Sequence, residues 1–283
     1  MKPPRVLHVV ESWPPASMGN ARRSREIISW QRKLGISEPL VLVSSRQDHY
    51  VGGDLTKLDE IPTKMVPVSP FERGFRRWRW STLDGKHLEQ TIRTEARAQS
   101  ADVLHVHASS VIGMSAARAA KRLGLPLVAE VRYDLASAFN SESFGGRLSF
   151  CELFLRRYFE RHLPSASVVV TASHALAELI ANIPGGKSVA AVPNGVRPVE
   201  SDADPARVDA RRQALGLTPG KMVVGTTSNM LHYEGPDLLL DALPSVADVE
   251  LLMVGGGPMR DMLKAKAARL PIKAVFVGRV PPE

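Results

Sequence analysis

The segments Asn229-Met-Leu-His-Tyr-Glu-Gly235 and Gly255-Gly-Gly-Pro258 decide the fold, because each follows an apolar run and precedes a helical pattern. From Val223 onward the chain therefore alternates strand, helix, strand, helix and strand. Strands that alternate with helices build a parallel sheet with right-handed crossovers. Such sheets bind ligands at the carboxyl ends of their strands, where both glycine-bearing turns lie. The sequence predicts a ligand-binding βα domain here.

The same alternation occupies the first part of the chain. Short apolar runs without polar alternation are typical of buried parallel strands. They occur at Arg5–Val10, Leu40–Val43, Met65–Val68, Val103–His107, Leu127–Val131, Val168–Thr171 and Ser188–Val192. Prolines and acidic residues after Pro193 indicate a linker. We therefore expect an α/β protein with two Rossmann-like parallel-sheet domains, at residues 1–195 and 220–283, joined by a linker at 196–219.

The composition indicates a globular protein with an anionic partner. The 283 residues carry a formal net charge of +8, which favours nucleic acid, acidic lipid or a phosphorylated ligand. The single cysteine, Cys151, excludes an intramolecular disulfide and favours a reducing compartment. No apolar run approaches the roughly 20 residues that a membrane helix needs. We expect a cytoplasmic protein.

Three arginines, Arg22, Arg23 and Arg25, fall in the first turns of a predicted helix. Each cation there costs a few tenths to about 1 kcal/mol, because the helix dipole is already positive at this end. An anion would instead be favoured by the helix and the arginines together. The segment favours an anion-binding site, and solvated arginines that tolerate this small cost are the alternative.

Polar residues also mark the ends of two predicted strands. His105 and His107 are two residues apart and point to one face. A metal site needs a third ligand, and no cluster of Cys or His offers one, so we predict no metal site. We expect His105 in the core and His107 facing a crevice. Glu130 and Arg132 are expensive to bury unless both are used, either in a salt bridge or in a ligand contact.

Neither glycine-rich segment is a complete nucleotide fingerprint. Gly185-Gly-Lys-Ser188 has Ala181 where a phosphate loop needs glycine, and it lies between a helix and a strand, so we predict a plain turn. Gly255-Gly-Gly-Pro258 opens a helix, but Arg260 stands where the dinucleotide fingerprint has its third glycine. Its glycines still permit a ligand to approach the backbone closely.

The stretch Arg73–Trp80 interleaves four arginines with three aromatic residues. Such a stretch suits an anionic membrane surface or single-stranded nucleic acid. The alternative is a surface loop whose tryptophans pack back on the domain. Because no nucleic-acid module is recognisable, we predict no nucleic-acid partner. The residues that would contact a membrane surface are Arg76, Arg77, Trp78, Arg79 and Trp80.

Taken together, these segments resemble glycosyltransferase family 4, the retaining enzymes with two facing Rossmann-like domains, known as the GT-B fold. The resemblance is carried by Ser17–Arg25, Ala101–His107, Val192–Gly195, Tyr233–Asp237, Gly255–Pro258 and Val277–Val280. The arginine-rich first helix, Glu130-Val-Arg132 and Tyr233-Glu-Gly235 look most like the branch associated with exopolysaccharide and exosortase loci.

The resemblance implies transfer of a sugar from a nucleotide-diphosphate sugar to an envelope or exopolysaccharide acceptor, without a cofactor or metal ion. The acceptor would be a glycan or lipid-linked, which implies a peripheral position at the inner face of the membrane. His107 would be the catalytic residue that contacts the donor sugar. The donor-binding residues would be Gly19, Asn20, Arg22, Arg132, Asn229, Glu234, Gly235, Gly256 and Arg279.

The chain also departs from the family pattern. Asn229 and Glu234 occupy positions where many members have an arginine and a lysine that grip the diphosphate, and Arg197 replaces an aspartate. The family's paired glutamates, eight residues apart, would follow Glu283, so we expect a C-terminally truncated chain with an incomplete second domain. Two alternatives stay open: a non-catalytic sugar-nucleotide-binding or scaffold protein, and a sugar-nucleotide epimerase.

Overall fold

The computed structural model describes residues 2–14, 19–44, 61–66, 85–107, 111–132, 163–182, 188–195 and 204–280. These residues divide into two compact units, one that extends to Gly195 and one that holds residues 204–280. The predicted membrane-surface segment Arg73–Trp80 lies outside the described residues.

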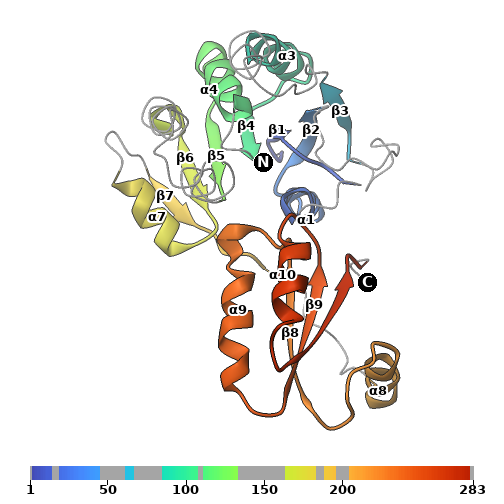
Figure 1. The fold of residues 1–283 in the computed structure, drawn as a ribbon. Coiled ribbons are helices and arrows are strands. Elements are labelled where there is room, and N and C mark those ends of the chain that lie inside the picture. The colour runs from blue at the N-terminus through green and yellow to red at the C-terminus, as the bar shows by residue number, and fades with distance from the viewer. Residues whose placement is uncertain are drawn as a thin grey trace. The chain divides into compact units, whose positions relative to one another are not determined.

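The first unit is built on a seven-stranded parallel sheet with the order β3-β2-β1-β4-β5-β6-β7 (Figure 1). Its strands are β1 (Arg5–Val10), β2 (Glu38–Ser44), β3 (Thr63–Val66), β4 (Val103–His107), β5 (Leu127–Val131), β6 (Val168–Thr171) and β7 (Val189–Ala191). Its helices are α1 (Gly19–Lys33), α3 (Gly85–Ala98), α4 (Val111–Leu123), α7 (His174–Ala181) and the short 3-10 helix η3 (Leu163–Ser165).

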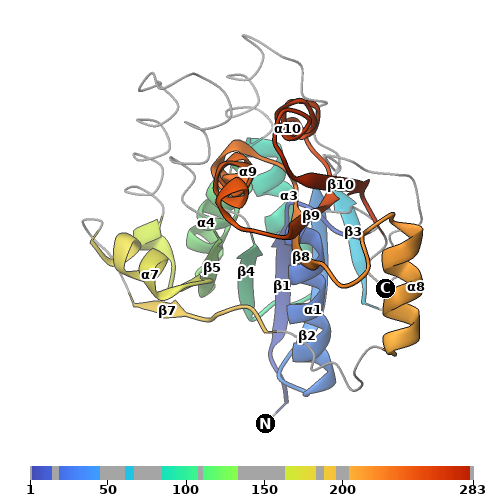
Figure 2. The same cartoon turned by 60° about the horizontal axis from the view of Figure 1, so that its bottom comes forward.

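Residues of each strand alternate between two faces of this sheet. Leu7 of β1 and Leu104 of β4 belong to the larger core, which includes buried residues of α3 and α4. Val10 of β1 instead packs with Ile28 of α1 in a second core. Figures 1 and 2 show α1 on the opposite side of the sheet from α3 and α4. Helices thus cover both faces, as a buried parallel sheet requires.

The strand order places β1 beside β4, although 92 residues separate their ends in the chain. In the parallel register His8 lies opposite His105, and Val10 lies opposite His107. The connections reverse direction between these two strands, and open α/β sheets bind ligands at this type of switch point. A ligand-binding site is therefore expected at the carboxyl ends of β1, β4 and β5.

The second unit has a three-stranded parallel sheet with the order β10-β9-β8. Its elements are α8 (Pro205–Ala214), β8 (Met222–Ser228), η4 (His232–Glu234), α9 (Pro236–Ala242), η5 (Leu243–Ser245), β9 (Val249–Gly255), α10 (Arg260–Ala267) and β10 (Lys273–Gly278). Leu240 of α9 and Leu263 of α10 share a core with Leu251 and Met253 of β9, so both helices cover one sheet face.

Helix α8 occupies part of the range predicted as a linker. Asp204 caps its start by accepting a hydrogen bond from the Ala206 backbone N–H at 3.0 Å. None of its residues is buried, so its position in the fold is not set by core packing. The two parallel sheets confirm the predicted α/β class.

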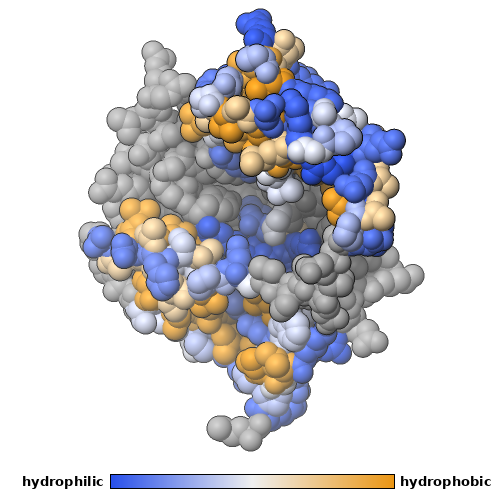
Figure 3. Space-filling model, turned by 90° about the horizontal axis from the view of Figure 1, so that it is seen from below, coloured by the Kyte–Doolittle hydropathy of each residue, from blue (hydrophilic) through white to orange (hydrophobic). Residues whose placement is uncertain are grey.

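Among the described residues, no helix is both long and apolar enough to cross a membrane. On the side of the molecule seen in Figure 3, hydrophobic and hydrophilic residues are interspersed over the described surface. Exposed apolar side chains such as Leu179 and Leu238 are scattered over different helices. Single exposed apolar residues of this kind are ordinary and need no binding partner.

Candidate functional site

A polar cluster lies on the α1 face of the first sheet. Its members on strands are His8 of β1, His105 and His107 of β4, and Glu130 of β5, and each is at most 8% exposed. They share this face because they alternate with the core residues Leu7, Leu104 and Ala129. Burial of so many polar groups is costly unless they are paired with one another.

Glu130 is the centre of this cluster. Arg23 of α1 donates from Nε to Glu130 Oε1 at 2.7 Å, and Arg132 donates from Nη2 to Oε2 at 2.9 Å. His107 Nδ1 lies 2.9 Å from Oε2. Burial alone would raise the pKa of Glu130, but the His107 hydrogen bond and the charges around it hold that pKa well below its usual value. Glu130 is therefore a fixed anion rather than an acid or base.

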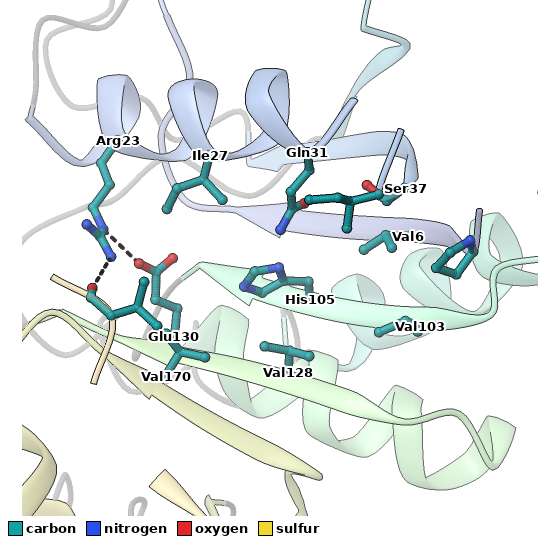
Figure 4. A pocket seen from close by; sticks show the side chains of 13 residues that line it. Val6, Arg23, Ile27, Gln31, Ser37, Val103, His105, Val128, Glu130 and Val170 are labelled. Carbon is teal, nitrogen blue, oxygen red and sulfur yellow. Dashed lines mark hydrogen bonds and ion pairs between the residues drawn. The ribbon is translucent and has the colours of Figure 1, made fainter. Parts of the chain in front are cut away.

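The two arginines connect Glu130 to other segments of the first unit. Arg132 donates from Nη1 to the Asn20 carbonyl oxygen at 2.8 Å and from Nη2 to Ser24 Oγ at 2.9 Å. Arg23 also donates from Nη2 to the Val192 carbonyl oxygen at 3.4 Å (Figure 4). The buried carboxylate thus fixes the first turns of α1 over the carboxyl end of β5.

The hydrogen bonds of His107 determine the arrangement of protons in the cluster. The Glu130 carboxylate can only accept, so we assign the His107 proton to Nδ1. His107 Nε2 then accepts from His8 Nδ1, which lies 3.0 Å away. This leaves Nε2 of His8 as a lone pair, and that buried atom has no hydrogen-bond partner among the described residues. His105 Nε2 is likewise buried without a partner among them.

All three histidines are neutral at pH 7. Burial lowers the pKa of His8 and of His105 well below 6.5, and repulsion from neighbouring histidines adds to this effect. Burial also lowers the pKa of His107, although the hydrogen bond and charge of Glu130 act in the opposite direction. Neutral imidazoles are the form that donates a lone pair.

Of the two histidines of β4, His107 differs from the expectation for its position. His107, expected to face a crevice, is 3% exposed, because Arg132 and His8 enclose its ring. His105 is buried, as expected of a core residue, and it also lines a pocket of about 300 Å³ together with Arg23 and Glu130 (Figure 4). The rest of the pocket wall is mainly apolar, with side chains from the sheet and from α1.

The other predicted residues of the first unit lie at the start of α1. Gly19 is the first residue of the helix, and the Asn20 carbonyl is held by Arg132. Arg22 is exposed, whereas Arg23 is engaged by Glu130. Of the two interpretations of Glu130 and Arg132, the structure shows the salt bridge.

Sequence reasoning missed His8 as a member of this cluster. Its signal was a histidine within the first apolar run, in the same alternation as Val6 and Val10. The doubly wound strand order, which places β1 beside β4, would have brought it to His105 and His107. The inference that no third histidine was available is therefore corrected by the register of β1 against β4.

In the second unit, the two glycine-bearing turns pack against each other at the carboxyl ends of β8 and β9. A Cβ atom on Gly255 would lie 2.0 Å from the Ser228 carbonyl oxygen, and one on Gly257 would lie 1.8 Å from that of Asn229. Gly255 also has a φ of 117°, which disfavours other residues. These two glycines are therefore required by the contact between the turns.

Gly256 differs from its two neighbours. A Cβ atom there would meet only the side chains of Arg260 and Arg279, at 3.9 Å. Arg279 donates from Nη2 to the Gly256 carbonyl oxygen at 3.4 Å, and Arg260 Nε is buried without a partner among the described residues. Sequence reasoning missed Arg260 as a member of this group. Two arginines thus flank the one glycine of the turn that steric contact leaves unconstrained.

The remaining predicted residues belong to the turn after β8. Asn229 is exposed, and Glu234 accepts a hydrogen bond from Ser228 Oγ at 2.5 Å. Gly235 has a φ of 62° and forms the junction between η4 and α9. The carboxylate of Glu234 therefore stabilises its own turn.

Comparison with known proteins assigns the family. Residues 18–195 match the family model of the glycosyl transferase 4-like domain, and the chain belongs to this family. The search of curated proteins found no match to the chain.

Solved structures of similar architecture support this assignment at the level of the fold. HepE of Anabaena in complex with UDP and glucose has a TM-score of 0.67 at 19% identity, over 98% of this chain and 70% of that one. A glycosyltransferase from Rickettsia africae has a TM-score of 0.69 at 16% identity, over 99% and 69%. The Neisseria meningitidis UDP-GlcNAc 2-epimerase bound to UDP-GlcNAc reaches 0.56 at 12%, over 99% and 72%. The architecture is that of the GT-B glycosyltransferases.

Proposed function

We propose that this protein transfers a sugar, with retention of configuration, from a nucleotide-diphosphate sugar to an envelope or exopolysaccharide acceptor, and that the transfer needs no metal ion. The family assignment and the complex of HepE with UDP and glucose support a sugar-nucleotide donor.

The observation that carries the proposal is the arrangement around Gly256. The turn lies at the carboxyl end of β9, where parallel sheets bind ligands, and the missing side chain permits close approach to the backbone. Arg260 and Arg279 flank this glycine. Their charges would stabilise a departing diphosphate in place of a cation, as preorganised donors do in other transferases.

Binding of UDP to the full chain tests the donor site. We expect calorimetric titration to show saturable binding that Arg279→Ala weakens by roughly 10- to 100-fold, the loss of a charge-assisted hydrogen bond. Arg269→Ala is the matched control, because Arg269 is exposed at the other end of α10. Equal weakening by both substitutions, or no UDP binding by the unaltered chain, would refute the site.

Transfer itself needs a separate measurement. Candidate UDP-sugars are incubated with lipid-linked or glycan acceptors in EDTA, and the anomeric configuration of the product is determined by NMR. Retention and activity in EDTA support the proposal, whereas inversion or a strict need for added metal contradicts it. The Neisseria epimerase shares the architecture, so the same assay without acceptor also monitors interconversion of the sugar nucleotide. Binding without any turnover would favour the non-catalytic alternative.

We retain His107 as the proposed residue for contact with the donor sugar. It ends β4 at the switch point of the sheet, where ligands approach. Because its ring is buried between Glu130 and His8, His107→Asn should both lower kcat and destabilise the first unit. Unchanged kcat in a folded variant would remove His107 from the site.

A further inference from the structure

Three histidine side chains from two adjacent strands converge under α1. His8, His105 and His107 each offer a ring nitrogen, and these atoms all lie within 4.8 Å of one another. The rings of His105 and His107 are stacked with centroids 4.0 Å apart, and the ring of His8 lies 5.1 Å from that of His105. The set comes together because β1 and β4 are paired with His8 opposite His105.

The hydrogen bonds of the cluster leave part of its lone-pair capacity unused. His8 Nε2 and His105 Nε2 are both buried without a partner among the described residues. Buried polar atoms are rarely left this way, and each such atom calls for an explanation such as an ion or a water molecule. Three neutral imidazoles form a donor set that suits a divalent first-row transition metal.

We propose that His8, His105 and His107 form a site for a divalent transition-metal ion, with Zn²⁺ as its preferred occupant. Three protein nitrogens and an open fourth position are common for zinc. This site lies within the first unit and is separate from the proposed binding of a diphosphate near Gly256. The two proposals share only His107, and a metal titration without substrate tests this site separately from sugar transfer.

The distances define what binding requires. Tetrahedral zinc holds nitrogens roughly 2.0–2.1 Å from the metal and thus roughly 3.4 Å apart. His8 Nδ1 and His107 Nε2 lie 3.0 Å apart, and one nitrogen from each of the three histidines lies within 4.8 Å of the others. The unpartnered lone pair of His8 Nε2 is the one offered to the ion, and the hydrogen bond between the rings of His8 and His107 is replaced when His107 Nε2 binds the metal.

Glu130 supplies the supporting contact that metal-bound histidines commonly have. Its carboxylate accepts from His107 Nδ1 at 2.9 Å, which fixes the ring and directs the Nε2 lone pair away from Glu130. Arg23 and Arg132 in turn fix the carboxylate. Glu130 is thus a positioning residue for the site rather than a ligand.

Cobalt titration of the full-length chain tests this proposal without any substrate. The purified chain is stripped with EDTA, and Co²⁺ is added while the visible absorption of low-coordinate cobalt is followed. We expect a saturable band at a single equivalent per chain, its loss on addition of Zn²⁺, and a higher melting temperature with either ion.

Two variants determine which residues bind the ion. His8→Gln and His105→Gln should each abolish the saturable band. His174→Ala should leave the band unchanged, because His174 is exposed on α7 of the same unit. Circular dichroism establishes that each variant is folded before its titration is interpreted.

The titration of the unaltered chain can overturn the proposal even if both glutamine variants fail to fold. Absence of a saturable band there, or a band that survives in folded His8→Gln, shows that the cluster is a hydrogen-bonded histidine group only. A band that disappears in His174→Ala places the ion on exposed histidines and equally refutes the site.

Discussion

Glu130 contacts two arginines and a histidine in a buried environment. Its negative charge offsets the cost of removing the two arginine charges from water. We predict that Glu130→Gln lowers the free energy of unfolding of the first unit by about 3–5 kcal/mol, because it leaves buried cations without their counter-charge. The chain's four tryptophans all lie within its first 80 residues, so tryptophan fluorescence in urea reports on this unit.

Glu38→Gln is the matched control for that measurement. Glu38 pairs with Lys2 and Arg5, but its side chain is 44% exposed, and such surface pairs contribute about 0–1 kcal/mol. Equal effects of the two substitutions would mean that the buried network contributes no more than a surface ion pair.

The buried histidines predict how stability depends on pH in the metal-free chain. The pKa values of His8, His105 and His107 are lowered in the folded state, so the unfolded chain binds more protons below its histidine pKa of about 6.5. Stability is complete above this pH and decreases as pH falls below it, by up to about 1.4 kcal/mol per pH unit for each histidine. Glu130, with its lowered pKa, adds a further loss only below its unfolded pKa of about 4.3.

Urea unfolding between pH 7.5 and 5.5 in EDTA, followed by tryptophan fluorescence, measures this effect. A folded His105→Gln variant should show a shallower dependence, because one of the three proton-binding groups is gone. The charged groups that face the cluster are Glu130, Arg132 and Arg23. Stability that is flat or that increases toward pH 5.5 would contradict the prediction.

At the residue scale the sequence predicted the charged pair but not its full set of partners. Glu130 and Arg132 were recognisable because charges next to a buried strand are costly to bury unless they are paired or bind a ligand. The pairing of Glu130 with Arg23 joins residues 107 positions apart, and no local pattern encodes that contact. The burial of His107 likewise depends on contacts with His8 and Arg132, which are distant in the sequence.

Among the elements, the contact between the turns after β8 and β9 gives a prediction for two neighbouring glycines. Gly257→Ala should destabilise the second unit by roughly 1–3 kcal/mol, because its Cβ would lie 1.8 Å from a backbone oxygen. Gly256→Ala should change stability by less than about 0.5 kcal/mol yet weaken UDP binding. Hydrogen exchange of peptides from β8 and β9, together with UDP titration, measures both quantities.

The outcome for the glycines distinguishes packing from ligand approach. Loss of UDP binding in Gly256→Ala with unchanged protection of β9 supports a ligand at this turn. Equal destabilisation by both substitutions would show that Gly256 is a packing residue like its neighbours, and a stable Gly257→Ala would contradict the steric argument.

Buried strands were the elements that the sequence predicted best. Four predicted strands coincide with β1, β4, β5 and β6: Arg5–Val10, Val103–His107, Leu127–Val131 and Val168–Thr171. A short, continuous apolar run bounded by polar residues is typical of a buried strand. β3 lies at Thr63–Val66 rather than at Met65–Val68. It is an edge strand of the first sheet, and only one of its four residues is fully buried, which gives a weaker apolar pattern.

For the whole molecule, the net charge of +8 and the basic, aromatic segment Arg73–Trp80 predict association with anionic membrane surfaces. We expect the chain to sediment with anionic liposomes at low salt. Replacement of Arg76, Arg77 and Arg79 by serine should weaken the free energy of liposome binding by about 1 kcal/mol for each arginine. The control replaces three arginines that are exposed in the second unit: Arg207, Arg211 and Arg269.

The two triple variants carry the same net charge, so their comparison separates a specific surface from general attraction. Weaker binding of the first variant alone supports a surface at this segment. Equal binding of both variants, or no dependence on salt, would reject it.

The network around Glu130 also limits the substitutions that this chain can accumulate over evolutionary time. Its members come from α1, β4 and the end of β5, so a change at Glu130 alone leaves Arg23 and Arg132 as unmatched buried cations. In buried ion clusters, joint replacement of all the charged residues by apolar side chains of similar volume can leave the stability of the fold unchanged or increase it. The effects of substitutions at the three positions should therefore be strongly non-additive. Each single substitution is selected against, so changes at Glu130, Arg23 and Arg132 are expected to occur together.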